Sequence, residues 1–191
     1  DNANFLVTAQ KQGLESKKAK FVLKSTSFLP SDIETEFYNN VYDNSRWNIS
    51  VRIKKNSSEP FIDMTNDSYD VCFSGYNYVQ DFLVQSFEKT QTISSADYIN
   101  FKNSNKSIFL GAERQNITGS VLTKADYKLI NFSAWKEYLS DDEIKLKAQN
   151  PFINGYSLSH ALERWLKMKK INIYYNIKVK NYIFKESDHA T

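Results

Sequence analysis

The chain has 191 residues, a net charge of +3 and 15% aromatic side chains, against only five Gly and three Pro. Such a length fits one domain, or one domain with an appendage, and it needs neither metals nor disulfides to fold. The basic excess is small and forms no basic stripe, which predicts no nucleic-acid partner. No apolar run reaches 18 residues, which predicts no membrane partner.

Alternation of apolar and polar residues is the dominant pattern along the chain. In residues 47–53 the odd positions are apolar and the even positions are polar, as a strand with one buried and one wet face requires. Further strands are expected at Phe5–Thr8, Phe21–Ser27, Tyr69–Phe73, Phe82–Phe87, Ser107–Ala112 and Asp126–Trp135. Polar turn segments at 30–32, 56–60 and 74–77 separate them. Many short strands of this kind favour a sandwich or barrel over βαβ units.

A short helix is expected near 140–149, ahead of Pro151. Ser140 and Glu143 have the spacing of a capping box, in which each side chain bonds the other residue's backbone amide. Leu139 and Ile144 occupy the positions of a hydrophobic staple around the same helix start.

The hydrophobic period changes after residue 155. Residues 158–166 carry a helical apolar stripe, and residues 171–183 place their apolar side chains on one parity, as in a long strand. We therefore expect a sandwich domain at 1–155 and a helix-plus-strand extension at 156–191, which could begin a following module. The chain begins at Asp1 rather than Met, so we expect it to be part of a longer polypeptide.

The residues typical of catalytic and metal sites are scarce. The one cysteine, Cys72, lies in an apolar stretch, which predicts a buried and inert thiol. The sequence contains no His-x-x-x-His or Cys-x-x-Cys spacing, no Gly-x-Ser-x-Gly elbow and no Glu-x-Asp-x-x-Glu strand of the kind that glycosidases use. We therefore expect a protein that is not an enzyme and has no cofactor and no metal.

Two alternatives to an inert surface stay open. Tyr76, Asn77 and Tyr78 follow Gly75 in a segment with turn composition, where exposed aromatic rings beside an amide would suit a carbohydrate. A cluster of oxygen-bearing side chains before the Tyr69 strand, formed by Asp63, Asn66 and Asp67, could bind Ca²⁺. An ordinary Asx-rich turn, which needs no metal, is the preferred explanation.

The order of features between about residues 20 and 150 resembles the concanavalin A-like lectin/glucanase domains, especially the laminin G-like modules. The resemblance is carried by Ser45–Val51, Ser107–Ala112, the turn at Gly119, Asp126–Trp135 and Tyr138–Ile144. It implies a mostly β fold, a jelly roll of two packed antiparallel sheets. The chain lacks the acidic catalytic strand of the family's enzymes and shows no clear match to its calcium ligands.

Residues 105–120 and 148–151 further resemble lectin-like domains of large virion proteins of phages and other big viruses. The expected function is thus a non-catalytic structural or interaction module in a virion, which packs against neighbouring subunits or modules or decorates the particle surface. The alternative is a carbohydrate-binding or adhesion module of a secreted or cell-surface protein, located outside the cell.

Overall fold

The chain divides into two compact units, Asp1–Asn154 and Gly155–Thr191. The computed structural model describes residues 5–25, 27–56, 68–104, 110–114, 120–124, 128–135 and 137–152, all of them in the first unit. The helix and strand predicted for 156–191 and the candidate calcium loop at Asp63, Asn66 and Asp67 lie outside the described residues.

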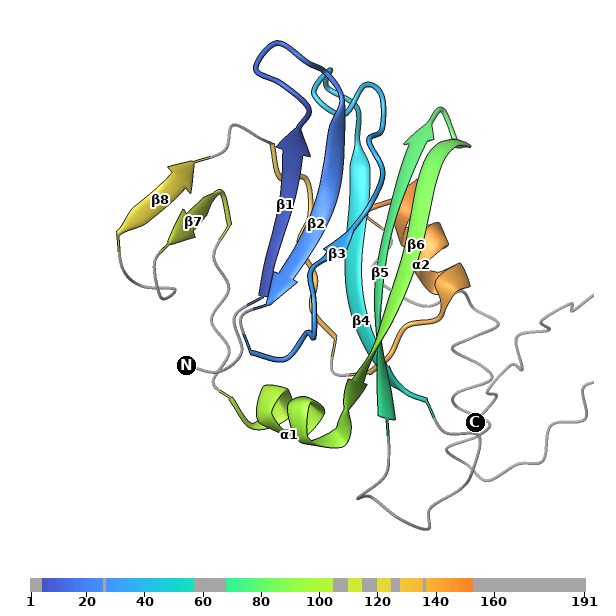
Figure 1. Cartoon of the computed structure of the whole chain (residues 1–191). Helices are drawn as coiled ribbons and strands as arrows, with labels where there is room; N and C mark the ends of the chain where they lie inside the picture. Colours follow the sequence, from blue (N-terminus) through green and yellow to red (C-terminus); the bar gives the residue numbers. More distant parts are fainter. Residues whose placement is uncertain are drawn as a thin grey trace, which may run out of the picture. The chain divides into compact units, whose positions relative to one another are not determined.

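The described part is mostly β, with two antiparallel three-stranded sheets and two short helices (Figure 1). Sheet A contains β1 (Phe5–Lys11), β2 (Ala19–Ser25) and β3 (Ile33–Glu34), and sheet B contains β4 (Trp47–Lys55), β5 (Ser68–Val79) and β6 (Phe82–Ser94). A separate hairpin joins β7 (Ala112–Arg114) to β8 (Val121–Lys124). The helices are α1 (Ser95–Asn103) and α2 (Asp141–Gln149).

Each strand of these sheets pairs with its neighbour in sequence. The mostly β prediction is confirmed, and the two sheets are consistent with a sandwich. A jelly roll also needs strands that cross between the sheets, and the described pairings contain none.

The main core lies between the inner faces of the two sheets. Phe21 of sheet A stacks on Phe87 of sheet B at 5.3 Å between ring centroids, and Trp47 lies 4.8 Å from Phe21. Val71 and Phe73 of β5 are fully buried in the same cluster. The alternation predicted at 47–53 is therefore correct for Trp47, Ile49 and Ile53, which pack against this core, whereas Val51 is exposed.

Helix α1 closes one end of the core and was not predicted from the sequence. Ser94 caps it by accepting a hydrogen bond from the amide of Asp97 at 3.2 Å. Phe101 packs on Phe5 at 5.2 Å, and Tyr98 stacks on Tyr69 at 3.8 Å between ring centroids. The helix thus fills the space between the ends of the sheets with aromatic rings.

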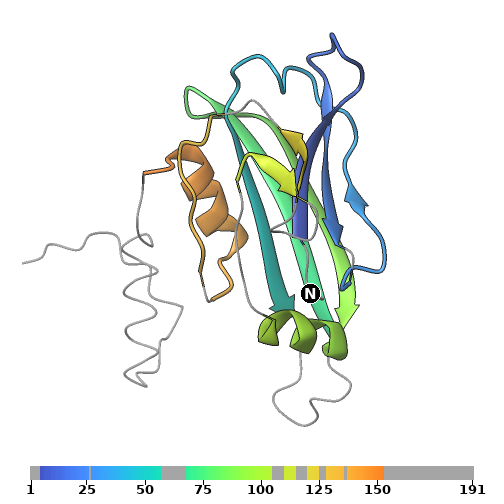
Figure 2. The ribbon, with the colours of Figure 1, turned by 90° about the vertical axis from the view of Figure 1, so that its left-hand side faces the viewer.

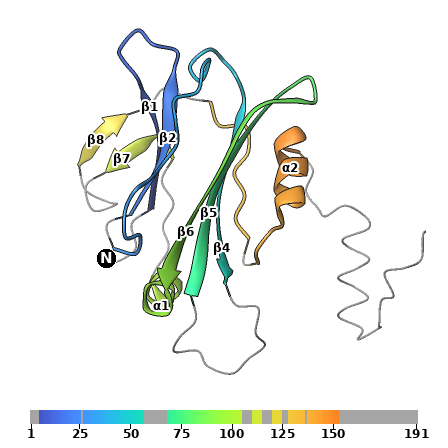
Figure 3. The ribbon, with the colours of Figure 1, turned by 45° about the vertical axis from the view of Figure 1, so that its right-hand side comes forward.

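Helix α2 begins as predicted, on a capping box. The Glu143 amide donates to Ser140 Oγ at 3.3 Å, and the Ser140 amide donates to Glu143 Oε2 at 2.8 Å. Leu139 and Ile144, the predicted staple residues, are both buried. The helix lies on the outer face of sheet B, on the side away from sheet A (Figures 2 and 3).

Two predictions about individual segments are wrong. Residues 74–77 form no turn, because β5 continues through them to Val79 and the reversal falls at Gln80 and Asp81, both with positive φ. The strand predicted for Asp126–Trp135 is not formed by its described part, since residues 128–135 pair with no strand of the described chain.

Candidate functional site

The predicted carbohydrate site does not form an exposed aromatic surface. Tyr76 and Asn77 lie within β5 and are only 1% and 4% exposed, while Tyr78 is half-buried. Tyr76 Oη donates a hydrogen bond to Glu88, and Asn77 Nδ2 donates to the carbonyl oxygen of Arg46 at 2.8 Å. Burial and the bond to Glu88 both raise the pKa of the Tyr76 hydroxyl. Tyr76 therefore has no free ring face for stacking on a sugar in this arrangement.

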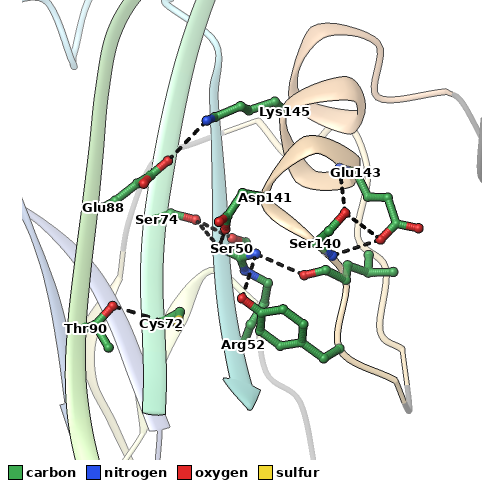
Figure 4. Close-up of polar contacts among 12 residues, drawn as sticks. Ser50, Arg52, Cys72, Ser74, Glu88, Thr90, Ser140, Asp141, Glu143 and Lys145 are labelled. Atoms are coloured by element: carbon green, nitrogen blue, oxygen red, sulfur yellow. Dashed lines mark hydrogen bonds and ion pairs between the residues drawn. The ribbon is translucent and has the colours of Figure 1, made fainter. Parts of the chain in front are cut away.

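Tyr76 is buried because a polar layer between sheet B and α2 covers the outer face of β5 (Figure 4). Arg52, on β4, lies at the centre of this layer and is only 8% exposed, although the alternation places it on the wet face. Its Nη1 donates to the carbonyl oxygen of Leu139 at 2.9 Å and to Tyr138 Oη at 3.3 Å. Its Nη2 lies 2.6 Å from Asp141 Oδ1. One guanidinium thus joins the sheet to the start of α2.

A small pocket lies beside Arg52, lined in part by Cys72, Thr90 and Tyr138. Cys72 is a buried free thiol, as predicted, and its sulfur accepts a weak hydrogen bond from Thr90 Oγ1 at 3.8 Å. Burial raises the pKa of Tyr138 to about 12, although the nearby Arg52 guanidinium favours its ionised form. Tyr138 is thus a neutral phenol at ordinary pH, whose ring lies 5.1 Å from the Arg52 guanidinium carbon.

The far end of α2 is held by a second arginine. Arg46 Nη2 donates to the carbonyl oxygens of Ala148 and Gln149, at 3.2 and 2.9 Å, which are among the last carbonyls of the helix. These groups have no partner within the helix, and a positive charge beside them also interacts favourably with the helix dipole. The two arginines bind opposite ends of α2.

Three carboxylates on alternate positions were missed by the sequence reading. Asp32, Glu34 and Glu36 lie at or beside β3, where alternation places them on one face. All three are exposed, Glu34 pairs with Lys20, and Asp32 Oδ2 lies 3.7 Å from Lys24 Nζ. They form an exposed surface, unlike the enclosed carboxylate pair of a glycosidase.

Metal-binding geometry does not occur in the part of the chain that the structure describes, where no three His, Cys, Asp or Glu side chains are grouped to hold an ion. The acidic side chains of the polar layer are bound to neighbours of the same chain, Asp141 to Arg52 and Glu88 to Tyr76 and Lys145. The layer is therefore suited to holding α2 in place. The absence of enzymatic activity stays a prediction.

Large apolar side chains are exposed at scattered positions, at the pair Val121 and Leu122, and in two longer stretches of the described chain. At the β5–β6 hairpin, Phe82 is 76% exposed and Val84 is 57% exposed, with Val79 and Leu83 about half exposed. A second group follows along residues 128–135: Leu129, Ile130, Phe132 and Trp135. Adjacent exposed apolar residues on a soluble domain are typical of contact surfaces.

No protein family model, no curated protein sequence and no solved structure matches this chain. Among the described residues, no helix is long and apolar enough to cross a membrane.

Proposed function

We propose that this domain is a non-catalytic interaction module of a larger assembly, built on a two-sheet sandwich of the jelly-roll type. Its partners would be neighbouring subunits or modules of the same polypeptide, and the setting we favour is a virion, which rests on the sequence resemblance alone. The observation that carries the proposal is the exposed apolar hairpin of β5 and β6.

The hairpin has two properties of a contact element. Its apolar residues are adjacent, since Phe82, Leu83 and Val84 follow one another directly after the turn. It also leads into β6, a 13-residue strand that has no strand on its far side within the described part of the chain. This edge carries only Glu88 and Lys89 as charges and no proline, and it is covered only in part, where Tyr38 Oη donates to the Ser86 carbonyl oxygen at 3.3 Å.

The polar contacts between sheet B and α2 support a structural role for this face of the sheet. Arg52 is buried and binds Asp141, while Glu88 accepts from Tyr76 and pairs with Lys145; the Asp141 and Glu88 side chains are about half exposed. Perturbed pKa values occur at active sites but also in structural networks, and here the raised values belong to tyrosines covered by packing.

The test is the fate of the parent protein in assembled particles. Cryo-electron microscopy of particles containing the chain should show the β5–β6 hairpin against a neighbouring subunit. Phe82→Ser together with Val84→Ser should lower incorporation into particles at least tenfold while the circular dichroism spectrum stays unchanged. Leu122→Ser, at an exposed apolar position on the separate β7–β8 hairpin, is the matched control. Absence of the protein from particles, or a hairpin surrounded by solvent in them, would reject the proposal.

A further inference from the structure

The segment 137–152, named here the α2 strap, forms a layer of its own on sheet B. Its buried apolar side chains are Leu139, Ile144 and Ala148. None of them belongs to the core cluster between the two sheets. The strap therefore packs against a face of sheet B that the main core does not use, and the sandwich interior is complete without it.

Much of the contact between strap and sheet is polar. Arg52 reaches Leu139, Tyr138 and Asp141 at the start of the strap, and Arg46 reaches Ala148 and Gln149 at its end. Lys145 Nζ adds a longer ion pair to Glu88 Oε1, at 3.6 Å. When such polar groups separate, water solvates them. Breaking these contacts therefore costs less free energy than exposing the same area of buried apolar surface.

The connection that leads into the strap does not anchor it to the sheets. Residues 128–135 make no backbone hydrogen bond with another backbone group of the described chain. Their side-chain contacts run to the strap itself, where Asn131 Nδ2 donates to the Pro151 carbonyl oxygen and Trp135 lies under Lys147. Helix α2 has nine residues, and a helix of this length is marginal in water without packing.

We propose that the α2 strap is a latch, which opens as a unit while the sandwich stays folded, and that Arg46 and Arg52 set how often it opens. The regions of a protein that open locally are those with few buried apolar contacts. Apart from the core, the strap contributes three buried apolar side chains and covers Tyr76 of β5. Opening would uncover the outer face of β5. Ser74 and Cys72 of this face line a pocket with Tyr138 and Asp141 of the strap, and the Tyr76 ring lies 5.8 Å from Lys145 Nζ.

Cys72 provides the readout, because it is the only cysteine in the sequence and lies buried beside Arg52 and Tyr138. The full 191-residue chain is treated with a bulky maleimide at increasing urea concentrations below the unfolding transition. Local opening predicts a labelling rate that hardly depends on urea, whereas labelling through global unfolding rises with the full urea dependence of unfolding.

Arg52→Lys and Arg46→Lys should each raise the labelling rate in water at least tenfold, because one ammonium cannot bridge the acceptors that a guanidinium bridges. Lys24→Gln, which removes an exposed ion pair of sheet A, is the matched control and should label at the wild-type rate. The hydrogen bonds of the Arg46 side chain run to the end of α2, so the Arg46 variant decides the question even if Arg52→Lys does not fold.

Hydrogen exchange measured by mass spectrometry gives a second, independent readout. Peptides covering residues 140–150 should exchange at least tenfold faster than peptides covering β5, and the arginine variants should widen this gap. Labelling that follows global unfolding in the wild type, arginine variants that label at the wild-type rate, or exchange of α2 together with β5 would each overturn the latch.

Discussion

Gly75 offers a direct test of the β5 strand, because a methyl group added at this position would clash with two neighbouring side chains. A Cβ at position 75 would lie 2.6 Å from Phe87 Cζ, closer still to Phe87 Cε1, and 2.9 Å from Ile49 Cδ1. Side-chain carbons in folded proteins do not approach this closely, so Gly75→Ala forces the Phe87 ring to move. That ring is buried between Phe21 and Phe73, at 5.3 and 4.9 Å between centroids.

The expected loss of stability follows from two opposing effects. Overpacking a tightly packed core costs about 1–3 kcal/mol, and the confined Phe87 ring places this site at the upper end. Alanine regains about 0.5–1 kcal/mol over glycine in a strand, because glycine loses more backbone entropy on folding. The net loss is therefore about 2 kcal/mol, or roughly 4–8 °C in Tm for a domain of this size.

Urea unfolding followed by tryptophan fluorescence measures this loss. Gly13→Ala is the matched control, since no atom lies within 4 Å of a Cβ built there, and it should change stability by less than about 0.5 kcal/mol. The double variant Gly75→Ala with Phe87→Leu should show a favourable coupling, because the smaller side chain relieves the clash. A Gly75→Ala protein as stable as the wild type would refute the strand register around Phe87.

Three further results are expected. Ser140→Ala should destabilise the domain by about 1 kcal/mol in urea unfolding, because the N-terminal amides of α2 lose an acceptor; Ser140→Asp should retain most of the stability. The pKa of Tyr138 is about 12 in the folded protein and near 10 in the unfolded chain, so the contribution of Tyr138 to stability should be intact below pH 10 and should be lost between pH 10 and 12. Tyr138→Phe should make the fall in stability over this range less steep. A slope equal to that of the wild type would contradict the raised pKa. Tyr76→Ala should cost about 3 kcal/mol of stability, because a buried ring is lost. On a glycan array, only Tyr78→Ala therefore tests sugar binding without also unfolding the domain. A wild-type protein that binds no glycan on the array would count against the carbohydrate-binding alternative.

The elements that the sequence predicts well are those whose pattern is local. The alternation from Trp47 to Ile53 marks β4, and the Ser140–Glu143 capping box marks the start of α2. Both signals depend on one strand or one helix turn and need no knowledge of the partner element. Helix α1 was missed because its apolar residues follow no helical stripe, as Tyr98 and Phe101 meet the ends of two sheets instead of one flat surface.

The covered outer face of sheet B could not be predicted, because nothing in the alternation distinguishes a face wetted by solvent from one covered by a polar layer. The residues 74–77 have the composition of a turn, yet the small side chains of Ser74 and Gly75 fit under Arg52 and Phe87. Small residues are common in turns, but they also occur in strands where neighbouring groups leave no room for a larger side chain. Composition alone does not distinguish the two cases.

The two sides of sheet B therefore differ in kind. The inner face is covered by aromatic rings, whose burial contributes several kcal/mol to the stability of the fold. The outer face is covered by the α2 strap, whose polar contacts with the sheet are made mainly by two arginines. A domain that needed α2 only for stability would gain more from an apolar residue at position 52, because replacing a buried charge in this way is often stabilising. The arginines instead give a contact that is specific in position and modest in strength, which is what a cover that has to open requires.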